Sequence, residues 1–323
     1  MPKSALAWPS GATLAVLQQR AQLTTAVRDF FAQRQVLEVH TPILGRGGST
    51  DAHLASLSTQ LSGLAEPVTL YLQTSPEFLM KRLLACGIGP IYQLGPCFRD
   101  GEISWRHNPE FWMLEWYRPG WTLAELEAEC CALVDQLLGA APYRRLTYRE
   151  AFVATLGLDP FQASLEALRD AAHHCSGIDA QQLDRDGCLD LLISHQIEPS
   201  FQGQRVVLYD FPASQAALAQ IHQDAQGDAV AARFELYING IEIANAYQEL
   251  TSAQEQAARF HADQQQRALL GLPAVPADQH LLAALEAGLP ECSGIALGFD
   301  RLVMLACNTA SLDATQAFSV QRC

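Results

Sequence analysis

The most constraining feature of this 323-residue chain is a pair of apolar strand patterns separated by a polar loop, between residues 98 and 111. Arg99 directly follows the first apolar run, and the second predicted strand begins at Asn-Pro-Glu-Phe, residues 108–111. Side chains alternate along a strand, so one face carries Phe111, Met113, Glu115 and Tyr117. That face has a carboxylate beside a phenol, whereas the other is mostly aromatic and aliphatic and suits a core. The pattern indicates either an ordinary hairpin with a long polar loop or a site that binds a phosphate and an amine together.

A second segment, residues 294–305, reads as a buried strand, a glycine turn and an apolar helix. Gly298 would let the backbone pass close to a ligand. Arg301 stands in the first helical turn, where a positive charge opposes the helix dipole, and this suggests a function. An arginine at a helix N-terminus forms an anion site. Alternatively, Arg301 only pairs with Asp300 or with another surface carboxylate.

The segment 233–250 predicts a β-hairpin, because Asn239-Gly240 favours a type I′ turn between two apolar runs. Glu242 and Glu249 follow, seven residues apart, and a regular strand would point them to opposite faces. A bulge or a strand end near Ala246 would be needed to bring them together. Taken alone, both carboxylates are more simply read as solvated groups.

Composition excludes some classes of function. Lys and Arg number 21 against 35 Asp and Glu, and the net charge of −14 disfavours sequence-independent nucleic-acid binding. Nine cysteines without a Cys-x-x-Cys pair make a zinc site unexpected and suggest reduced thiols. The first residues contain no long apolar run, so we expect neither a signal peptide nor a membrane span. Together with the reduced thiols, this leads us to expect a cytoplasmic location.

The chain length would fit one large domain or two. Helical and strand patterns mix along the chain in α+β fashion. Residues 12–35 repeat apolar positions as an amphipathic helix does. Residues from about 155 to 230 are rich in Ala, Gln and Asp and are expected to form a mainly helical insertion with little chemistry.

Three motifs resemble those of the class II aminoacyl-tRNA synthetases of the lysyl branch. Arg-His-Asn-Pro-Glu-Phe at 106–111 is similar to motif 2, Gly-Phe-Asp-Arg-Leu-Val-Met-Leu at 298–305 to motif 3, and Val-Leu-Glu-Val-His-Thr-Pro at 36–42 to motif 1. The resemblance covers nearly the whole chain. It implies an α+β fold in which a class II synthetase-like antiparallel sheet is flanked by helices, as a single catalytic domain over 1–323. Motif 1 forms the dimer interface in the class, so a homodimer is expected.

The candidate motif 1 helix begins near residue 12, so no anticodon-binding domain is expected before it. A free-standing core of this kind resembles the family of elongation factor P–(R)-β-lysine ligases, and residues 75–84 and 292–298 are also similar to that family. This implies that (R)-β-lysine, or lysine, is activated as an adenylate with ATP and Mg²⁺ and is passed to a lysine ε-amine of elongation factor P. Ala296 stands where lysyl-tRNA synthetases have glycine. Its methyl group would narrow the amino-acid pocket and favour β-lysine.

The resemblance also implies roles for individual residues. Arg99 would contact the α-phosphate and the substrate carboxylate, and Arg301 the γ-phosphate, as the catalytic pair. The implied ATP-binding set is Arg99, Asp100, Gly101, His107, Asn108, Phe111, Glu242, Ile243, Gly298 and Arg301. The implied set for the amino acid is Ser75, Pro76, Glu77, Glu115, Tyr117, Glu249 and Ala296. Glu242 and Glu249 would hold the magnesium ion.

Motif 2 departs from the pattern of the family at one position. The family usually has Arg-x-Glu, but this chain has Arg99-Asp100-Gly101-Glu102. Either Glu102 reads adenine after a shift of the loop, or the backbone of Gly101 makes that contact.

Three functions remain open at this point: a ligase acting on elongation factor P, a truncated lysyl-tRNA synthetase-like enzyme that acylates tRNA, and a catalytically silent paralogue that serves as a binding or regulatory module. The acidic charge and the absence of an anticodon domain weigh against stable tRNA binding. Retention of the arginines and glutamates of the implied site weighs against silence.

Overall fold

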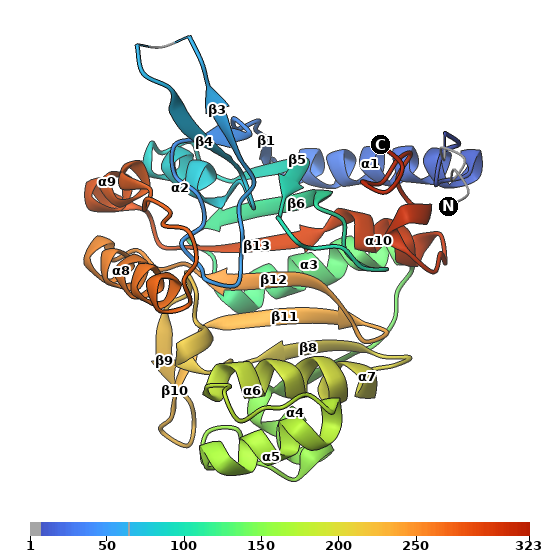
Figure 1. Cartoon of the computed structure of the whole chain (residues 1–323). Coiled ribbons are helices and arrows are strands. Elements are labelled where there is room, and N and C mark those ends of the chain that lie inside the picture. Colours follow the sequence, from blue (N-terminus) through green and yellow to red (C-terminus); the bar gives the residue numbers. More distant parts are fainter. Residues whose placement is uncertain (1–7, 64) are drawn as a thin grey trace, which may run out of the picture. The chain divides into compact units, whose positions relative to one another are not determined.

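The computed structural model describes residues 8–63 and 65–323 and divides into two compact units (Figure 1). The described residues of the first unit fall within Met1–Trp121, Leu126–Gly139 and Thr251–Cys323. The second unit consists of Thr122–Glu125 and Ala140–Leu250. Each unit combines strands with covering helices, so the predicted α+β class is confirmed.

The strands of the first unit follow the order β1-β5-β6-β13. Their bounds are β1 (Leu37–Glu38), β5 (Ile91–Phe98), β6 (Glu110–Pro119) and β13 (Cys292–Gly298). β1 pairs with β5 in parallel, whereas β5–β6 and β6–β13 are antiparallel. A separate antiparallel sheet has β4 (Val68–Leu72) between β2 (Leu44–Gly45) and β3 (Ser58–Leu61). The strands predicted on either side of the polar loop and before motif 3 are therefore present.

Helices cover the sheet of the first unit (Figure 1). They are α1 (Leu14–Gln33), α2 (Glu77–Ala85), α3 (Leu123–Leu138, whose first turn belongs to the second unit), α8 (Ala253–Leu269), α9 (Gln279–Gly288) and α10 (Phe299–Ala306). The predicted motif 1 helix is α1, and it packs on the sheet through Phe31, whose ring lies 4.4 Å from that of Tyr92 and 5.3 Å from that of Trp116. Residues of α2, α8, α9 and the strands form an apolar cluster: Met80, Leu84, Ile91, Tyr117, Phe260, Leu281, Leu285, Leu289 and Cys292.

The strands of the second unit follow the order β12-β11-β8-β7. They are β7 (Tyr143–Thr147), β8 (Arg205–Tyr209), β11 (Arg233–Ile238) and β12 (Ile241–Gln248), with a small sheet of β9 (Ile221–Gln223) and β10 (Ala229–Ala231). The helices are α4 (Tyr148–Leu156), α5 (Leu165–Ser176), α6 (Arg185–Leu192) and α7 (Glu198–Ser200), and a π-helical turn, Ile193–Ile197, joins the last two. The segment 155–230 therefore combines helices with strands β8, β9 and β10.

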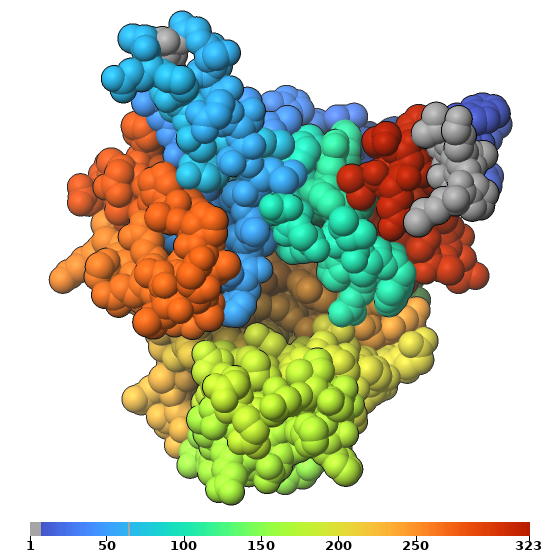
Figure 2. Space-filling view, viewed as in Figure 1, coloured from blue at the N-terminus to red at the C-terminus, as the bar shows by residue number. Residues whose placement is uncertain are grey.

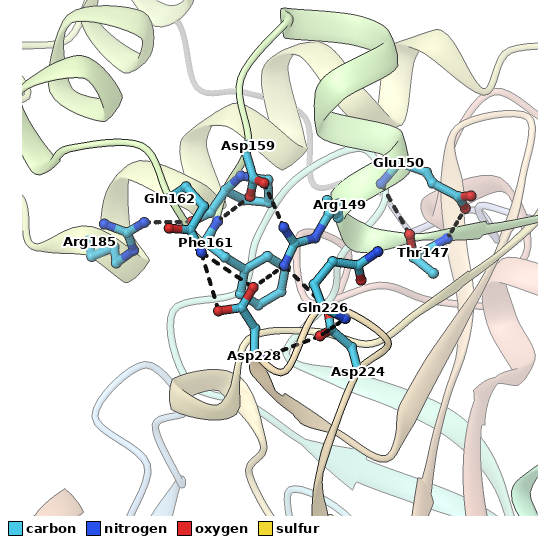
Figure 3. A network of polar contacts seen from close by, with 11 residues as sticks. Thr147, Arg149, Glu150, Asp159, Phe161, Gln162, Arg185, Asp224, Gln226 and Asp228 are labelled. Atoms are coloured by element: carbon cyan, nitrogen blue, oxygen red, sulfur yellow. Dashed lines mark hydrogen bonds and ion pairs between the residues drawn. The ribbon is translucent and has the colours of Figure 1, made fainter.

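Arg149 organises the polar contacts of α4 in the second unit (Figure 3). Its guanidinium lies 2.6 Å from a carboxylate oxygen of Asp159 and 3.2 Å from one of Asp224, and it also pairs with Asp228. The ring of Phe161 lies 4.6 Å from the guanidinium carbon. One arginine thereby ties α4 to the loop that precedes α5 and to the turn between β9 and β10.

None of the helices in the described residues is long and apolar enough to cross a bilayer.

The hairpin of β11 and β12 has the predicted turn. Asn239 and Gly240 both adopt positive φ angles, +53° and +73°, as a type I′ turn requires. A Cβ atom at Gly240 would lie 2.6 Å from the carbonyl oxygen of Glu198 in α7. The glycine is therefore needed both for its backbone angle and for the close approach of α7.

We expect Gly240→Ala to destabilise the protein by more than about 1 kcal/mol, because backbone strain at positive φ is joined by a steric clash. Gly203→Ala is the matched control, since Gly203 has φ +76° but a Cβ atom there would have no neighbour within 4 Å. Urea denaturation of both variants measures the difference. Equal losses for the two variants would show that the close approach of Glu198 costs nothing beyond the backbone strain.

Candidate active site

Arg99 stands at the end of β5, where the polar loop begins. Its guanidinium carbon lies 5.1 Å from the centre of the Phe111 ring, and its Nη1 atom lies 3.7 Å from a carboxylate oxygen of Glu102. The Nε atom of Arg99 is buried and has no hydrogen-bond partner. The aromatic ring thus orients a guanidinium that still has a donor to offer to an anion.

Arg301 and His107 come together from opposite ends of the sequence. Nη2 of Arg301 lies 2.8 Å from Nε2 of His107, and Nδ1 of His107 lies 2.7 Å from Oγ of Ser104. An arginine can only donate, so Nε2 accepts and the proton of a neutral imidazole lies on Nδ1. Two residues of the implied ATP set are therefore in contact. The alternative pairing of Arg301 with Asp300 is not favoured, since the Asp300 carboxylate receives Arg20.

The loop between these residues lies at the surface in the blue-green segment of Figure 2. Gly101 adopts φ +78°, a left-handed angle that suits glycine, and the next residue, Glu102, reaches back toward Arg99. Asp100 is tied by its amide to the carbonyl of Ala55, at 2.9 Å. The displaced glutamate of motif 2 is thus an ion-pair partner of the motif 2 arginine.

Asn108 stands just before β6, and Gly298 stands at the start of α10. The side chain of Asn108 donates to the carbonyl of Glu110, at 2.6 Å, and accepts from the amide of Val320, at 3.1 Å. Gly298 is the N-cap of α10, and a Cβ there would lie 3.5 Å from the side chain of Arg301. Contact of Asn108 and Gly298 with ATP remains a prediction.

Glu115 is a buried carboxylate on the site face of β6, with 2 % of its surface exposed. One oxygen accepts from Oγ of Ser75 at 2.7 Å, and the other accepts from the hydroxyl of Tyr117 at 2.6 Å. Ser75 also accepts from the amide of Glu77, at 3.0 Å. Hydroxyl donors on both oxygens stabilise a carboxylate that can receive an amine.

The sheet places Ala296 directly beside this carboxylate. Glu115 pairs with Gln93 on β5 and with Ala296 on β13. Directly paired residues of antiparallel strands lie on the same face, so the three side chains stand in a row. The methyl group that was expected to narrow the pocket thus neighbours the carboxylate expected to hold an amine.

Glu77 already has a cationic partner within the protein. Nζ of Lys81, whose side chain is 1 % exposed, lies 2.7 Å from a carboxylate oxygen of Glu77 one helical turn away. Pro76 is the N-cap of α2 and offers no side-chain hydrogen bond. Of the implied amine ligands in the first unit, Glu115 therefore has the stronger case. The spacing of four residues between Glu77 and Lys81 was the signal in the sequence that could have shown this pair.

A β-bulge reorients Glu242, the one carboxylate of β12, in the second unit. Leu236 pairs with Ala244, but Tyr237 pairs with Glu242, so Ile243 is the extra residue. The bulge turns Glu242 to the face that carries Asn245, Tyr247 and Glu249. The expected bulge therefore exists, at Ile243 rather than near Ala246. It leaves Ile243, a residue of the implied ATP set, outside the regular ladder.

Glu249 lies just beyond the end of β12, seven positions from Glu242. A rise of about 3.3 Å per residue puts the two positions roughly 20 Å apart along an extended chain, which favours separate roles for them. Glu235 is closer to Glu242: it lies two residues from Tyr237, the partner of Glu242, on the same face of the adjacent strand. Such diagonal neighbours are typically about 7–8 Å apart.

Glu235 is a candidate site residue that the sequence pattern did not reveal. Burial raises its pKa to about 7, against the opposing charge of Arg233 and with a further contribution from the charge of Glu242. Arg233 and the hydroxyl of Tyr237 both donate to it. Pairing the strands on either side of the Asn239-Gly240 turn could have found it, but only if the bulge were known.

Asn245 and Tyr247 lie on the same face and were also not predicted. The side-chain oxygen of Asn245 accepts from Nε of Arg233 at 3.0 Å, and its nitrogen donates to the hydroxyl of Tyr247 at 3.0 Å. Together they line the face between Glu242 and Glu249.

Within residues 8–63 and 65–323, no three His, Cys, Asp or Glu side chains are grouped so that they could hold a metal ion. Magnesium commonly uses only one or two protein carboxylates, with substrate phosphates and water completing its shell. Glu235 and Glu242 provide such a carboxylate pair, and hard oxygen donors fit that ion.

Comparisons with known proteins identify the family of the chain. Residues 3–322 match the family described as tRNA synthetases class II (D, K and N). Proteins named elongation factor P–(R)-β-lysine ligase are similar over 320 residues, 98 % of both chains, at 49 % identity in Pseudoalteromonas translucida, 46 % in Photorhabdus laumondii and 45 % in Proteus mirabilis. These matches confirm the resemblance that motifs 1 to 3 indicated. The chain therefore belongs to the class II tRNA synthetase family of the D, K and N enzymes.

Proposed function

We propose that this protein is an ATP-dependent ligase that activates (R)-β-lysine as an aminoacyl-adenylate and transfers it to a lysine ε-amine of elongation factor P. The observation that carries the proposal is similarity over 98 % of the chain to ligases of that name, at up to 49 % identity. The buried Glu115, held by Ser75 and Tyr117 beside Ala296, supports an amine-bearing substrate.

In the first step, an oxygen of the substrate carboxylate attacks the α-phosphorus of ATP. A new phosphorus–oxygen bond forms as the bond to pyrophosphate breaks. Two anions must approach each other, so cationic donors are needed where the charge develops. Arg99, oriented by Phe111, would contact the α-phosphate and the carboxylate, and Arg301 would contact the γ-phosphate. Glu242 with Glu235 would hold Mg²⁺, which offsets the phosphate charge as pyrophosphate leaves.

In the second step, a neutral lysine ε-amine of the acceptor attacks the acyl carbon, and AMP leaves with the electron pair of the acyl–oxygen bond. The amine must lose its proton to become a nucleophile. Glu249 is buried and lies just beyond the end of β12, seven positions from Glu242, which supports a role in binding the amino acid rather than the metal ion.

Two other functions compete with the ligase. A tRNA-acylating enzyme would use the same adenylate, but the net charge of −14 disfavours a nucleic-acid partner. A silent paralogue would not need Arg99 poised over Phe111 or a carboxylate held by two hydroxyl donors. The ligase is therefore the favoured function.

We also propose a cytoplasmic homodimer. Leu14 on α1 and Leu37 on β1 are 71 % and 54 % exposed, and both belong to the implied motif 1. β1 is the terminal strand of its sheet, so it has an edge available for a partner. Sedimentation velocity tests this assembly.

ATP–pyrophosphate exchange tests the proposed chemistry. We expect exchange that depends on amino acid and favours (R)-β-lysine over L-α-lysine, with labelled β-lysine then transferred to elongation factor P. Arg301→Ala should lower kcat/KM about 100-fold or more, because a preorganised donor to the reacting phosphates is lost. Arg144→Ala, an exposed position on β7, is the control. Preference for α-lysine with acylation of tRNA would support the synthetase instead, and no exchange at all would support the silent module.

Ala296→Gly should shift the ratio of kcat/KM for the two amino acids toward α-lysine by about tenfold, since one methyl group in a pocket typically discriminates at that level. Steady-state exchange with each amino acid gives the ratio. Ala244→Gly is the control, because it removes a methyl group from the face of β12 opposite to Glu242 and Asn245. It should leave the ratio unchanged. An unchanged ratio in Ala296→Gly would show that this methyl group does not set the selectivity.

Glu235→Gln and Glu249→Gln should separate the metal site from the amino-acid site. The first should raise the Mg²⁺ concentration for half-maximal exchange by about tenfold, because a charged oxygen ligand becomes a neutral one. The second should raise KM for β-lysine by a similar factor while leaving the Mg²⁺ dependence in place. The opposite result, in which Glu249→Gln shifts the Mg²⁺ requirement, would restore Glu249 as the metal ligand.

A further inference from the structure

The Asp300 carboxylate is a buried junction in the first unit. It lies in the first turn of α10 with 1 % of its surface exposed. It accepts from the main-chain amide of Trp112 and from the side chain of Gln316, each at 2.9 Å, and it forms an ion pair with Arg20. A buried carboxylate is costly without a paired cation. Here the cation comes from α1, 280 residues away in the sequence.

Arg20 is itself held in one orientation. Its guanidinium carbon lies 5.6 Å from the Trp112 ring and 5.3 Å from the Phe299 ring. The two rings and the carboxylate of Asp300 define the plane and the direction of the guanidinium. The guanidinium of Arg20 therefore has a defined position beside Asp300, unlike a mobile charge at the surface.

Asp300 connects two residues of the implied nucleotide site through the backbone. The amide that it accepts belongs to Trp112, the residue after Phe111, whose ring lies against Arg99. Asp300 also immediately precedes Arg301, whose side chain contacts His107. A shift of the Asp300 carboxylate would move the start of β6 and the first turn of α10 at the same time.

We propose that Arg20 is a positioning residue for the nucleotide site: it fixes Asp300, and through it the placement of Phe111 and Arg301, without touching a substrate. This inference rests on the proposed function, in which Phe111 and Arg301 bind ATP. The amine pocket is built from other hydrogen bonds, those of Ser75 and Tyr117 with Glu115. Loss of Arg20 should therefore weaken ATP binding far more than amino-acid binding.

Arg20→Met keeps an apolar side chain between the two rings but removes the ion pair. We expect the Kd for ATP with Mg²⁺, measured by isothermal titration calorimetry, to rise about tenfold or more, because small misplacements of binding groups are costly. The KM for ATP in exchange should rise in parallel, and the KM for (R)-β-lysine should change less than about threefold. Arg20→Lys, which retains the charge but not the planar group, should give an intermediate Kd.

Arg28→Met is the matched control, because Arg28 stands on the same helix and forms an exposed ion pair with Glu38 at 3.1 Å. It should leave the ATP and amino-acid constants unchanged. A folded Arg20→Met variant that binds ATP as the wild type does would overturn the proposal. Equal losses for ATP and for the amino acid would also overturn it, since they would indicate a general structural defect.

The double variant Arg20→Met/Asp300→Asn covers the case in which the single variant does not fold, because it leaves no unpaired buried charge. The proposal expects its ATP affinity to stay about tenfold weaker, since the amide at 300 has lost the guanidinium that orients it. Wild-type affinity in the double variant would show that Arg20 only neutralises Asp300, and would overturn the proposal. Weakened ATP binding together with an inactive wild-type enzyme would leave the positioning role intact and refute the proposed function instead.

Discussion

The free-energy cost of burying a carboxylate is the constraint on which much of this structure depends. A carboxylate removed from water must recover hydrogen bonds or a cation from the protein. Glu115 recovers two hydroxyl groups, Glu235 an arginine and a tyrosine, and Asp300 an arginine, a main-chain amide and a glutamine. Asp300 and Glu115 thereby join segments that are distant in the sequence, whereas the partners of Glu235 stand two positions away on the same strand.

A hydrogen bond from a tyrosine hydroxyl to a glutamate two positions away on the same strand occurs in both units. In β6, the hydroxyl of Tyr117 donates to Glu115, and in β11, the hydroxyl of Tyr237 donates to Glu235. The two residues of each pair are separated by one position, so strand alternation places them on the same face. The environments differ, because Glu115 receives a second neutral hydroxyl whereas Glu235 receives a guanidinium. In the proposed function, Glu115 would receive the charged amine of the substrate, and Glu235 would stand beside Glu242 at the metal site.

A single extra residue in β12 decides which carboxylates can cooperate. Without the bulge at Ile243, Glu242 would point to the face opposite Asn245, Tyr247 and Glu249. With it, all four share a face, and Glu242 becomes a diagonal neighbour of Glu235. The strand rise still keeps Glu242 and Glu249 roughly 20 Å apart along the chain. The bulge thus supports the proposal that Glu235 and Glu242 hold the metal ion and that Glu249 binds the amino acid.

The features that could be predicted from the sequence are those that depend on near neighbours in the chain. These include the face that carries Glu115 and Tyr117, the Asn239-Gly240 turn, and the strand, glycine turn and helix around Arg301. Alternation, turn propensity and helix capping are local, so a linear pattern is enough to predict them. The motifs also identified the family, because the residues that perform the chemistry recur at similar spacing.

The partners of those residues could not be predicted from the sequence, because many of them come from distant parts of the chain. The pairing of Asp300 with Arg20 spans 280 residues, and the contact of Arg301 with His107 spans 194. The register that sets Glu235 beside Glu242 depends on a bulge whose exact position no local rule gives. Such contacts form because each buried polar group needs a hydrogen-bond donor or acceptor, and the packed elements supply it from residues that lie nearby in space. That choice is made by the geometry of the fold and not by spacing along the chain.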